Sequence, residues 1–400
     1  MEALPTESSL VVDRPEVPQA SFAAADLPPS LPVAPEKETL HFSFTGSGKE
    51  YFRIWIVNLC LTIATLGIYS AWAKVRRLQY FDRNTQLAGA AFDFHGDPKA
   101  ILKGRIFAVA LLTVYHYAFG FSKYFGIAVL CFLLLSLPWM LRSALRFRLR
   151  NSSYRALRFG FKGSLRAAYA SYFPMLLMFL LPGALISMDP TLARFVFYVF
   201  LLYLLWPLVH AAMKRYQHGN LEYRSSHSTY TVGTGKFLKV YLIAILIAFG
   251  VILLGAIAMT GTIAAVMFFN KAFAQKSGWM LGGTFGFIYV YLVFLFAGLY
   301  LQVRIYNLAW TNTSFPHFKI QSSMRVWAYI RLQAGNTILT LLSLGLYRPF
   351  AVVKVYKYRL ACMAIETQGS FDQLVSSEHA GAEGAGGDSA ADFLSLDLSW

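Results

Sequence analysis

The stretch of sequence that decides the fold class is residues 240–269, VYLIAILIAFGVILLGAIAMTGTIAAVMFF. It holds no charged residue and is longer than the roughly 20 residues that a helix needs to cross a bilayer. The stretch therefore predicts a membrane-spanning helix. Its surplus length requires that helix to tilt, bend or project from the membrane.

Further apolar runs lie on both sides of this stretch. With it they make six runs of spanning length: Ile106–Phe121, Phe125–Leu141, Tyr172–Met188, Phe195–Met213, Val240–Phe269 and Met280–Val303. Two weaker segments carry polar residues and a central Gly: Ile54–Trp72 and Thr337–Val353. The sequence predicts an all-α polytopic membrane protein, a bundle of repeated helix pairs.

The composition excludes a soluble protein. Hydrophobic residues make up 56% of the chain and charged residues 14%, whereas soluble domains carry roughly 25% charged residues. Residues 41–365 hold 34 basic and six acidic residues. Nucleic-acid-binding proteins also show such an excess, but not together with long apolar runs, so we expect no nucleic acid among the partners.

The two ends of the chain differ from this core. Residues 1–40 are acidic and rich in Pro, Ala and Ser, without the basic start and apolar stretch of a cleavable signal peptide. Residues 366–400 hold seven acidic residues and no Lys or Arg. We predict two disordered acidic tails around a membrane domain at residues 41–365.

The basic residues predict how the helices are oriented. Four lie in the short connections after the first, third and fifth runs: Lys123, Arg194, Lys271 and Lys276. The other 30 basic residues of the core lie in the long connections or the weaker segments. By the positive-inside rule the long connections are expected to be cytoplasmic, and both tails with them.

Internal repetition is the most informative feature of the chain. Residues 58–72 and 336–350 both read Asn-x3-Thr-x2-(Thr/Ser)-Leu-Gly-(Ile/Leu)-Tyr-x2-aromatic, at a constant offset of 278 positions. The other helix pairs end in looser versions of this pattern. In each of them an aromatic residue, the anchor, stands among basic residues and is followed by a polar turn. The five anchors are Tyr80, Phe147, Tyr216, Tyr306 and Tyr358. We predict five related units.

A second repeated element reads aromatic-x-aromatic-x-Gly. It occurs at Phe42–Gly46, Phe92–Gly96 and Phe159–Gly163. Alternation with period two favours short β segments. Two interpretations stay open: the segments pair into a small cytoplasmic sheet beneath the helices, or their aromatic side chains lie at the level of the lipid headgroups.

The first and last units are too short for two full spans, because only about 35 residues separate their flanking segments. We favour two re-entrant hairpins bent at Leu66-Gly67 and Leu344-Gly345, beside six full spans. Arg348 next to the second bend is awkward for this hypothesis. The alternative is a single span in each end unit, which gives eight spans.

Three segments resemble the bacterial YjgN family. They are Gly46–Phe52 (GSGKEYF), Thr65–Arg77 (TLGIYSAWAKVRR) and Phe92–Gly96 (FDFHG), the last followed by Lys103-Gly104. The resemblance covers residues 41–370. It implies a multi-pass protein of the bacterial inner membrane, and it implies no activity, because the family carries a domain of unknown function.

Residues typical of catalysis are scarce. The six acidic residues of the core lie at helix ends or in loops: Glu50, Asp82, Asp93, Asp97, Asp189 and Glu222. The sequence has no metal-ligand spacing, nucleophile elbow or phosphate-binding loop, and no carboxylate within the apolar runs to relay protons. We expect no enzyme activity, no metal and no cofactor.

Two polar pairs are candidates for a solute pathway. Asn58 and Thr62 lie one helical turn apart, as do Asn336 and Thr340 in the matching unit. Polar residues in broken helices of matched halves are typical of a transporter's binding site. Hydrogen bonding between packed helices explains the same residues, and we give that structural interpretation more weight.

Basic residues at the cytoplasmic helix ends determine topology and are also candidates for contacts with anionic lipid headgroups. They are Arg76, Arg77, Arg146, Arg148, Arg150, Lys354 and Lys357. We favour a transporter or channel for an unidentified small solute. The alternative is a membrane-organising protein that binds anionic lipid without transport or catalysis. The sequence leaves the substrate and the oligomeric state open.

Overall fold

The computed structural model describes residues 37–189, 201–223, 226–269 and 271–368, together with residues 191, 194 and 198. All of them lie within one compact unit. Within this part the chain runs five times through a strand, a helix pair and a second strand. In chain order the elements are β1 (Lys37–Phe44), α1 (Gly48–Ala64), α2 (Ser70–Arg83), β2 (Thr85–Leu87), β3 (Ala90–Phe94), α3 (Pro98–Phe121), α4 (Lys123–Arg150), β4 (Ser152–Tyr154), β5 (Leu157–Phe161), α5 (Leu165–Met188), η2 (Leu202–Leu205), α7 (Trp206–His218), β6 (Leu221–Tyr223), β7 (Ser226–His227), β8 (Thr229–Tyr230), α8 (Thr234–Phe269), α9 (Lys271–Val293), η3 (Phe294–Gly298), α10 (Leu299–Thr311), β9 (Thr313–Ser314), β10 (Phe318–Ser322), α11 (Val326–Leu342), α12 (Arg348–Ala361) and β11 (Met363–Gln368).

The strands form one antiparallel sheet of eleven strands in the order β7-β6-β5-β4-β3-β2-β1-β11-β10-β9-β8. The two strands that bracket each helix pair are neighbours in this order. The edge strands β7 and β8 are separated only by Ser228, which exchanges two hydrogen bonds of 2.9 Å with the backbone of Leu221 in β6. The two ends of the sheet therefore meet, and we call the result the strand ring.

The prediction of an all-α protein is wrong. The strands are two to eight residues long, and partners come from opposite ends of the chain, as where β1 pairs with β11. A local pattern shows that a segment is extended but not what it pairs with. Some strands pair with the next strand in the chain, such as β2 with β3. The backbone groups of β1 gain partners in β11 only when the first and last units come together.

Aromatic side chains fill one side of the strand ring. The first aromatic residues of the three repeated segments lie against one another, with ring centroids 6.2 Å apart for Phe42 and Phe92 and 6.3 Å apart for Phe92 and Phe159. They form one cluster with buried Tyr154 and Ile365. Burial of this aromatic area holds strands of different units together.

The second aromatic residue of each segment packs against the anchor of its own unit. Phe44 lies against the anchor Tyr80, and the anchor closes over Gly46. A Cβ added at Gly46 would lie 2.7 Å from both Phe44 Cζ and Tyr80 Oη. The motif therefore ends in glycine because an aromatic ring occupies the place of a side chain.

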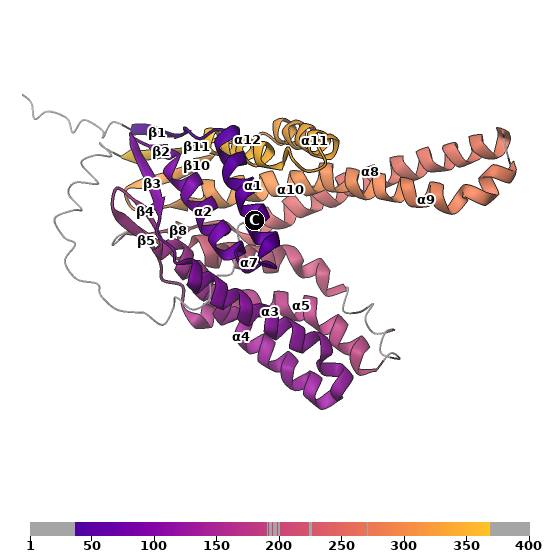
Figure 1. The fold of residues 1–400 in the computed structure, drawn as a ribbon, viewed down its shortest axis with the longest axis horizontal. Helices are drawn as coiled ribbons and strands as arrows, with labels where there is room; N and C mark the ends of the chain where they lie inside the picture. Colours follow the sequence, from indigo (N-terminus) through magenta and orange to yellow (C-terminus); the bar gives the residue numbers. More distant parts are fainter. Residues whose placement is uncertain are drawn as a thin grey trace, which may run out of the picture. The chain divides into compact units, whose positions relative to one another are not determined.

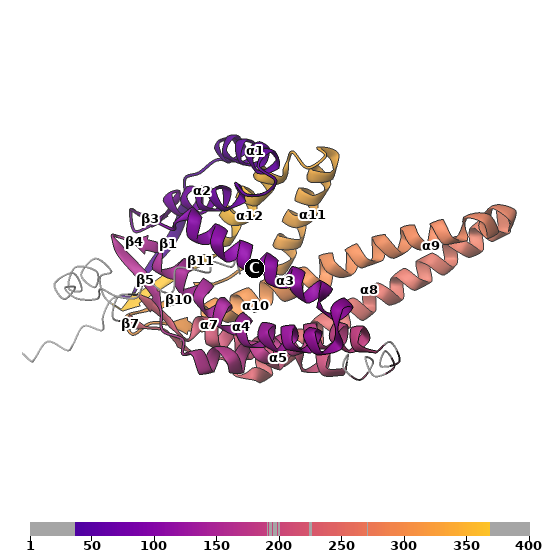
Figure 2. The ribbon, with the colours of Figure 1, turned by 60° about the horizontal axis from the view of Figure 1, so that its bottom comes forward.

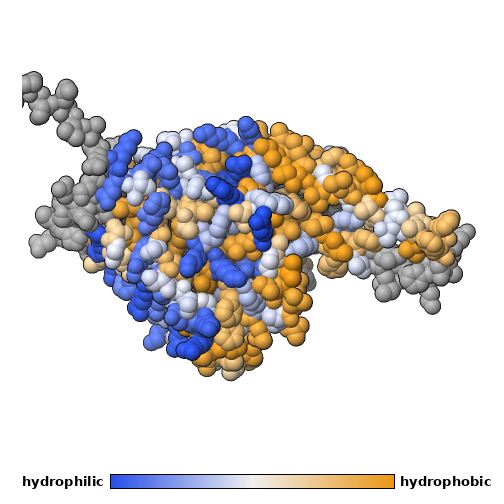
Figure 3. Space-filling view, turned by 90° about the horizontal axis from the view of Figure 1, so that it is seen from above, coloured by the Kyte–Doolittle hydropathy of each residue, from blue (hydrophilic) through white to orange (hydrophobic). Residues whose placement is uncertain are grey.

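The helices contact one another in chain order, and α12 contacts α1, so the helix contacts also close on themselves. Figures 1 and 2 show the strands gathered at one end of the helix pairs, with the long α8–α9 pair extending away from them. Hydrophilic residues cover the strand-bearing part of the face drawn in Figure 3, and hydrophobic residues cover the helices beyond it. This division is that of a protein with one part in lipid and one in water.

Five described helical segments are long and apolar enough to cross a membrane: α3, α4, α5, α8 and the segment Gly282–Thr311. The prediction of six full spans, or of eight, is therefore wrong for the part of the chain that is described. The predicted run Phe195–Met213 lies partly outside that part, and its described end forms η2 and α7. The end-unit helices have 17 and 14 residues, about 26 and 21 Å, against a hydrocarbon core of about 30 Å.

Each end unit is a short helix pair that turns at its Leu-Gly pair. Leu66 and Gly67 have φ values of 49° and 93°, and Leu344 and Gly345 have 50° and 93°. The left-handed conformation at the second position favours glycine. The Gly67 N–H donates to Thr62 O at 2.7 Å and closes the turn.

The predicted boundaries of the tails fall inside strands. β1 begins at Lys37 and β11 ends at Gln368, and these two residues are register partners. The described chain therefore begins and ends at one place in the sheet. The remainder of both predicted tails lies outside the described residues.

Candidate functional site

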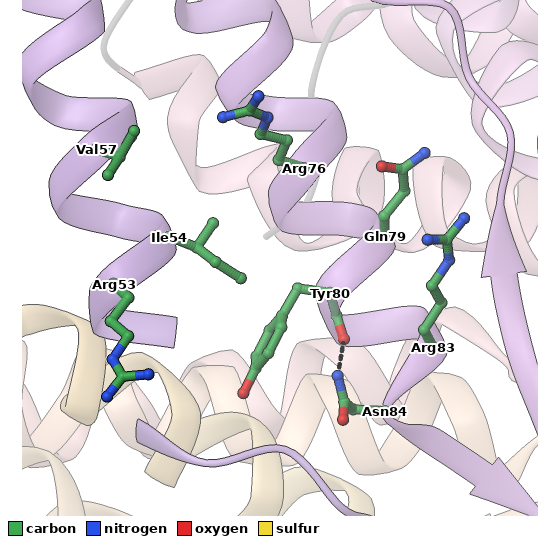
Figure 4. A pocket seen from close by; sticks show the side chains of 8 residues that line it. All are labelled: Arg53, Ile54, Val57, Arg76, Gln79, Tyr80, Arg83 and Asn84. Carbon is green, nitrogen blue, oxygen red and sulfur yellow. Dashed lines mark hydrogen bonds between the residues drawn. The ribbon is translucent and has the colours of Figure 1, made fainter. Parts of the chain in front are cut away.

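An open groove of about 530 Å³ lies between α1 and α2. Figure 4 shows the side chains around it, which come from both helices and from the C-cap of α2. They are Arg53, Ile54, Val57, Arg76, Gln79, Tyr80, Arg83 and Asn84. The lining combines three guanidinium groups with two aliphatic side chains.

The anchor tyrosine fixes the two helices that form the groove. Tyr80 Oη accepts a hydrogen bond from the Ser47 N–H at 2.9 Å and donates one to Ser47 O at 2.8 Å. Ser47 also caps α1 in a capping box with Glu50. Burial raises the pKa of Tyr80 to about 12, so the phenol keeps the proton that it donates at neutral pH.

The three guanidinium groups differ in their partners. Arg83 Nε donates to Asp93 Oδ1 of β3 at 2.8 Å. Arg76 lies over the ring of Tyr69, with Cζ 5.6 Å from the centroid. Arg53 makes no hydrogen bond or ion pair with any residue of the described part, and both Arg53 and Arg76 are exposed. Two of the three groups thus keep N–H donors for a ligand.

The groove keeps an excess of positive charge. Burial favours a protonated Asp93, but the hydrogen bonds from Arg83 and from the Phe94 N–H outweigh it and hold the pKa of Asp93 below its ordinary value. Asp93 is therefore ionised and balances Arg83. The lining itself holds no carboxylate, but the Glu50 carboxylate accepts a hydrogen bond from Tyr80 Oη at 3.2 Å. Three guanidinium groups therefore stand against two carboxylates, Asp93 and Glu50.

The structure disperses the basic residues that the sequence singled out for lipid contact. Arg76 lines the groove, while its neighbour Arg77 lies near Tyr51. On α4, Arg146 Nε donates to Phe161 O at 3.4 Å, and Arg148 lies near Asp82. Arg150 is the last residue of α4, and Lys354 and Lys357 are exposed on α12. These seven residues therefore come from three helices, α2, α4 and α12.

The predicted pathway residues lie against neighbouring helices. Asn58 and Asn336 are 7% and 5% exposed. The hydroxyls of Thr62 and Thr340 each donate to the carbonyl of the preceding Asn at 2.6 Å, within their own helix. Asn58 Oδ1 and Asn336 Nδ2 are buried without a partner. Neither Asn lines the groove, so a solute pathway stays a prediction.

The sequence analysis did not single out Arg53, Val57 or Gln79 as site residues. A signal for Arg53 was available, because Arg331 stands at the same offset of 278 positions, five residues before the matched Asn. Val57 and Gln79 have no such match, and only the packing of α2 against α1 shows that they face the same space. Within the described part of the chain, no three His, Cys, Asp or Glu side chains lie close enough to hold a metal ion.

These features define a class: a helical membrane protein whose helix pairs are joined at one end by a ring of short strands. The family model for "Bacterial protein of unknown function (DUF898)" matches residues 39–393, and the chain belongs to this family. It is 33% identical to the inner membrane protein YjgN of Salmonella typhimurium (strain LT2) over 144 residues, and 31% identical to that of Escherichia coli (strain K12) over the same length.

Each of these alignments covers 34% of the chain and 35% of the relative, so the chain spans about a third of the length of the curated relatives it matches. No solved structure matches the chain. The resemblance to the YjgN family is confirmed, as is the location in the bacterial inner membrane. The cytoplasmic position of both termini stays a prediction.

Proposed function

We propose that the protein binds the headgroup of an anionic phospholipid in the groove between α1 and α2. The observation that carries the proposal is the lining of the groove. Exposed Arg53 and Arg76 stand beside the aliphatic side chains of Ile54 and Val57 in one opening. A phospholipid offers the same combination, a phosphate next to an acyl chain.

The charge chemistry supports a phosphate group. Arginine presents several N–H donors in a planar fork that matches the oxygens of a phosphate. Each basic residue near an anionic membrane surface contributes about 1 kcal/mol to binding. Arg53 and Arg76 together then supply about 2 kcal/mol, or about 30-fold in affinity.

The position of the groove also fits a lipid better than a soluble ligand. Outward-facing apolar residues follow its lining along the same hairpin: Ile63 is 67% exposed and Leu66 94% exposed. At the other end, α2 leads into the strand ring and its polar residues. A groove between apolar and polar surface lies where headgroups lie.

Transport receives less support. Asn58 is buried, and the Thr62 hydroxyl is used by the backbone of its own helix. The Thr62 bond lies within one helix and Asn58 Oδ1 has no partner, so hydrogen bonding between helices also stays a prediction. We therefore place lipid binding ahead of the solute pathway, which the sequence had favoured.

The test is native mass spectrometry of the full chain in detergent, with phosphatidylglycerol or phosphatidylcholine added. We expect retention of phosphatidylglycerol, and a loss of about 30-fold in its affinity in Arg53→Gln/Arg76→Gln. The matched control is Arg158→Gln/Lys319→Gln, which removes two exposed cations from strands β5 and β10. Equal retention of both lipids, or equal loss in both double variants, would contradict the proposal.

A further inference from the structure

The fifth unit repeats the backbone of the first with other side chains. α11 and α12 have 17 and 14 residues, as do α1 and α2. The φ values at the two Leu-Gly turns agree within 1°. The Tyr358 hydroxyl bridges the N–H and C=O of Arg325 at 3.1 and 3.2 Å, as Tyr80 bridges those of Ser47. The offset of 278 positions therefore relates the two helix pairs in space as well as in sequence.

Two cations of the groove keep their places under this offset. Arg53 corresponds to Arg331 and Arg76 to Lys354, and all four are exposed. Arg76 lies 5.6 Å from the ring centroid of Tyr69, and the Lys354 ammonium lies 5.2 Å from that of the matching tyrosine of the second turn. A tyrosine of the turn thus contacts the cation in both units, and Lys354 Nζ also donates a hydrogen bond to the Tyr347 hydroxyl.

Most of the other positions of the fifth unit that match the lining of the first groove carry different side chains. Ala361 replaces Arg83, while Lys357 replaces Gln79 and restores the third cation. Gly335 replaces Val57, and a Cβ added there would meet nothing within 4 Å. At the positions that match the lining, this helix pair therefore has three cations and one aliphatic side chain fewer than the first groove.

We propose that α11 and α12 hold a second anionic-phospholipid headgroup, bound by Arg331, Lys354 and Lys357. The proposal rests on the function proposed for the first groove and extends it: each chain binds two such lipids, one in each end unit. Two lysines replace two groups of the first lining, and a lysine binds phosphate as a point charge without the arginine fork. The second lipid is therefore expected to leave first as salt rises.

Counting lipids on the full chain by native mass spectrometry tests this. With phosphatidylglycerol in excess, we expect two bound lipids in the wild type and one in Arg331→Gln/Lys354→Gln. We expect one in Arg53→Gln/Arg76→Gln and none when all four changes are combined. The control Arg158→Gln/Lys319→Gln should keep two.

A variant that leaves the charge unchanged distinguishes binding at a specific site from general electrostatic attraction of the lipid to basic residues. Gly335→Trp fills the open space and keeps all three cations, and it should lose the second lipid. Lys354→Arg/Lys357→Arg should retain it, which shows that the fold tolerates changes at these positions. Addition of excess inorganic phosphate distinguishes a lipid site from a site for the free ion, and we expect it to leave both lipids bound.

The outcomes separate the two proposals. If the wild type binds a single lipid and Arg53→Gln/Arg76→Gln removes it, the proposal for the first groove stands and the proposal of a second site is overturned. Two lipids in Arg331→Gln/Lys354→Gln, or in Gly335→Trp, would also overturn it, as would displacement of the second lipid by inorganic phosphate. No preference for phosphatidylglycerol in any form would instead overturn the proposed function of the first groove.

Discussion

The first and second units are neighbours in the strand ring, joined through β2 and β3, yet their helices differ in kind. α1 and α2 have 17 and 14 residues, whereas α3 and α4 have 24 and 28. Only the second pair is long enough to cross a bilayer of about 30 Å. Both units have the same junction between helices and strands but helices of different length. The sequence therefore specifies this junction independently of the length of the helices.

The junction repeats in detail. Gly46 and Gly96 both lie under an aromatic ring. Asn84 and Asn151 each cap the second helix, with Nδ2 donating to the carbonyl four residues before at 2.7 and 2.8 Å. The backbone carbonyls of the same two asparagines accept N–H groups that follow β1 and β3, at 3.0 and 2.8 Å. One asparagine thus ends a helix and joins it to a strand.

Breaking the common junction should have the largest effect. A Cβ at Gly96 would lie 2.5 Å from the ring of Phe94, which is fully buried and has no room to move. We expect Gly96→Val to lower the free energy of unfolding by about 3 kcal/mol, and Gly46→Val in the first unit to do the same. The measurement is thermal unfolding in detergent. Gly120→Val, at a helical glycine with open space around it, is the control, and an equal loss there would contradict the argument.

A buried carboxyl between the two units gives the next effect. Burial raises the pKa of Asp82 to about 6, with Arg148 of the second unit acting in the opposite direction. Because the folded state holds this proton more tightly than the unfolded state, the contribution of Asp82 to stability is greatest below about pH 4 and falls as pH rises to about 6. Asp82→Asn should remove that fall, about 3 kcal/mol, seen as a flatter dependence of the unfolding temperature on pH. A parallel profile in wild type and variant would show that the pKa of Asp82 is the same in the folded and unfolded states.

The asparagine caps should contribute less. Asn84→Ala and Asn151→Ala each remove one hydrogen bond to a terminal carbonyl, and we expect each to cost about 1 kcal/mol. The fifth unit offers the reverse experiment, because Cys362 stands at the corresponding position. Cys362→Asn is expected to raise the unfolding temperature. A loss of stability there would show that the cap depends on the surroundings of each unit.

The smallest effect on stability is expected from a substitution within the first helix of a unit. Where α1 has Asn58, α3 has Ala108 at the same distance from the junction glycine, packed in an apolar cluster. Asn58 Oδ1 is buried without a partner, so Asn58→Leu should change stability by less than about 1 kcal/mol. Unfolding in detergent measures this, and a loss of several kcal/mol would reveal a hydrogen bond that makes Asn58 essential to the helix packing.

The sequence predicted some features of the site and missed others for a physical reason. Arg76 was recognised because basic residues gather around each anchor. Its partner in the groove, Arg53, stands 23 positions earlier, and no local pattern connects the two. The turn at Leu66-Gly67 brings them to one opening, and the contact exists only after the hairpin has formed.

The sequence alone predicted the membrane class and the family, and it favoured the bends at the two Leu-Gly pairs and the short extended segments. These depend on composition, on hydrophobic run length and on residues such as Gly67 whose backbone needs are local. Only the tertiary structure decided that the extended segments close into a strand ring and that five described helical segments are long enough to span. Strand partners are chosen by backbone groups that carry no residue-specific signal, and β1 meets β11 only when the whole chain has folded.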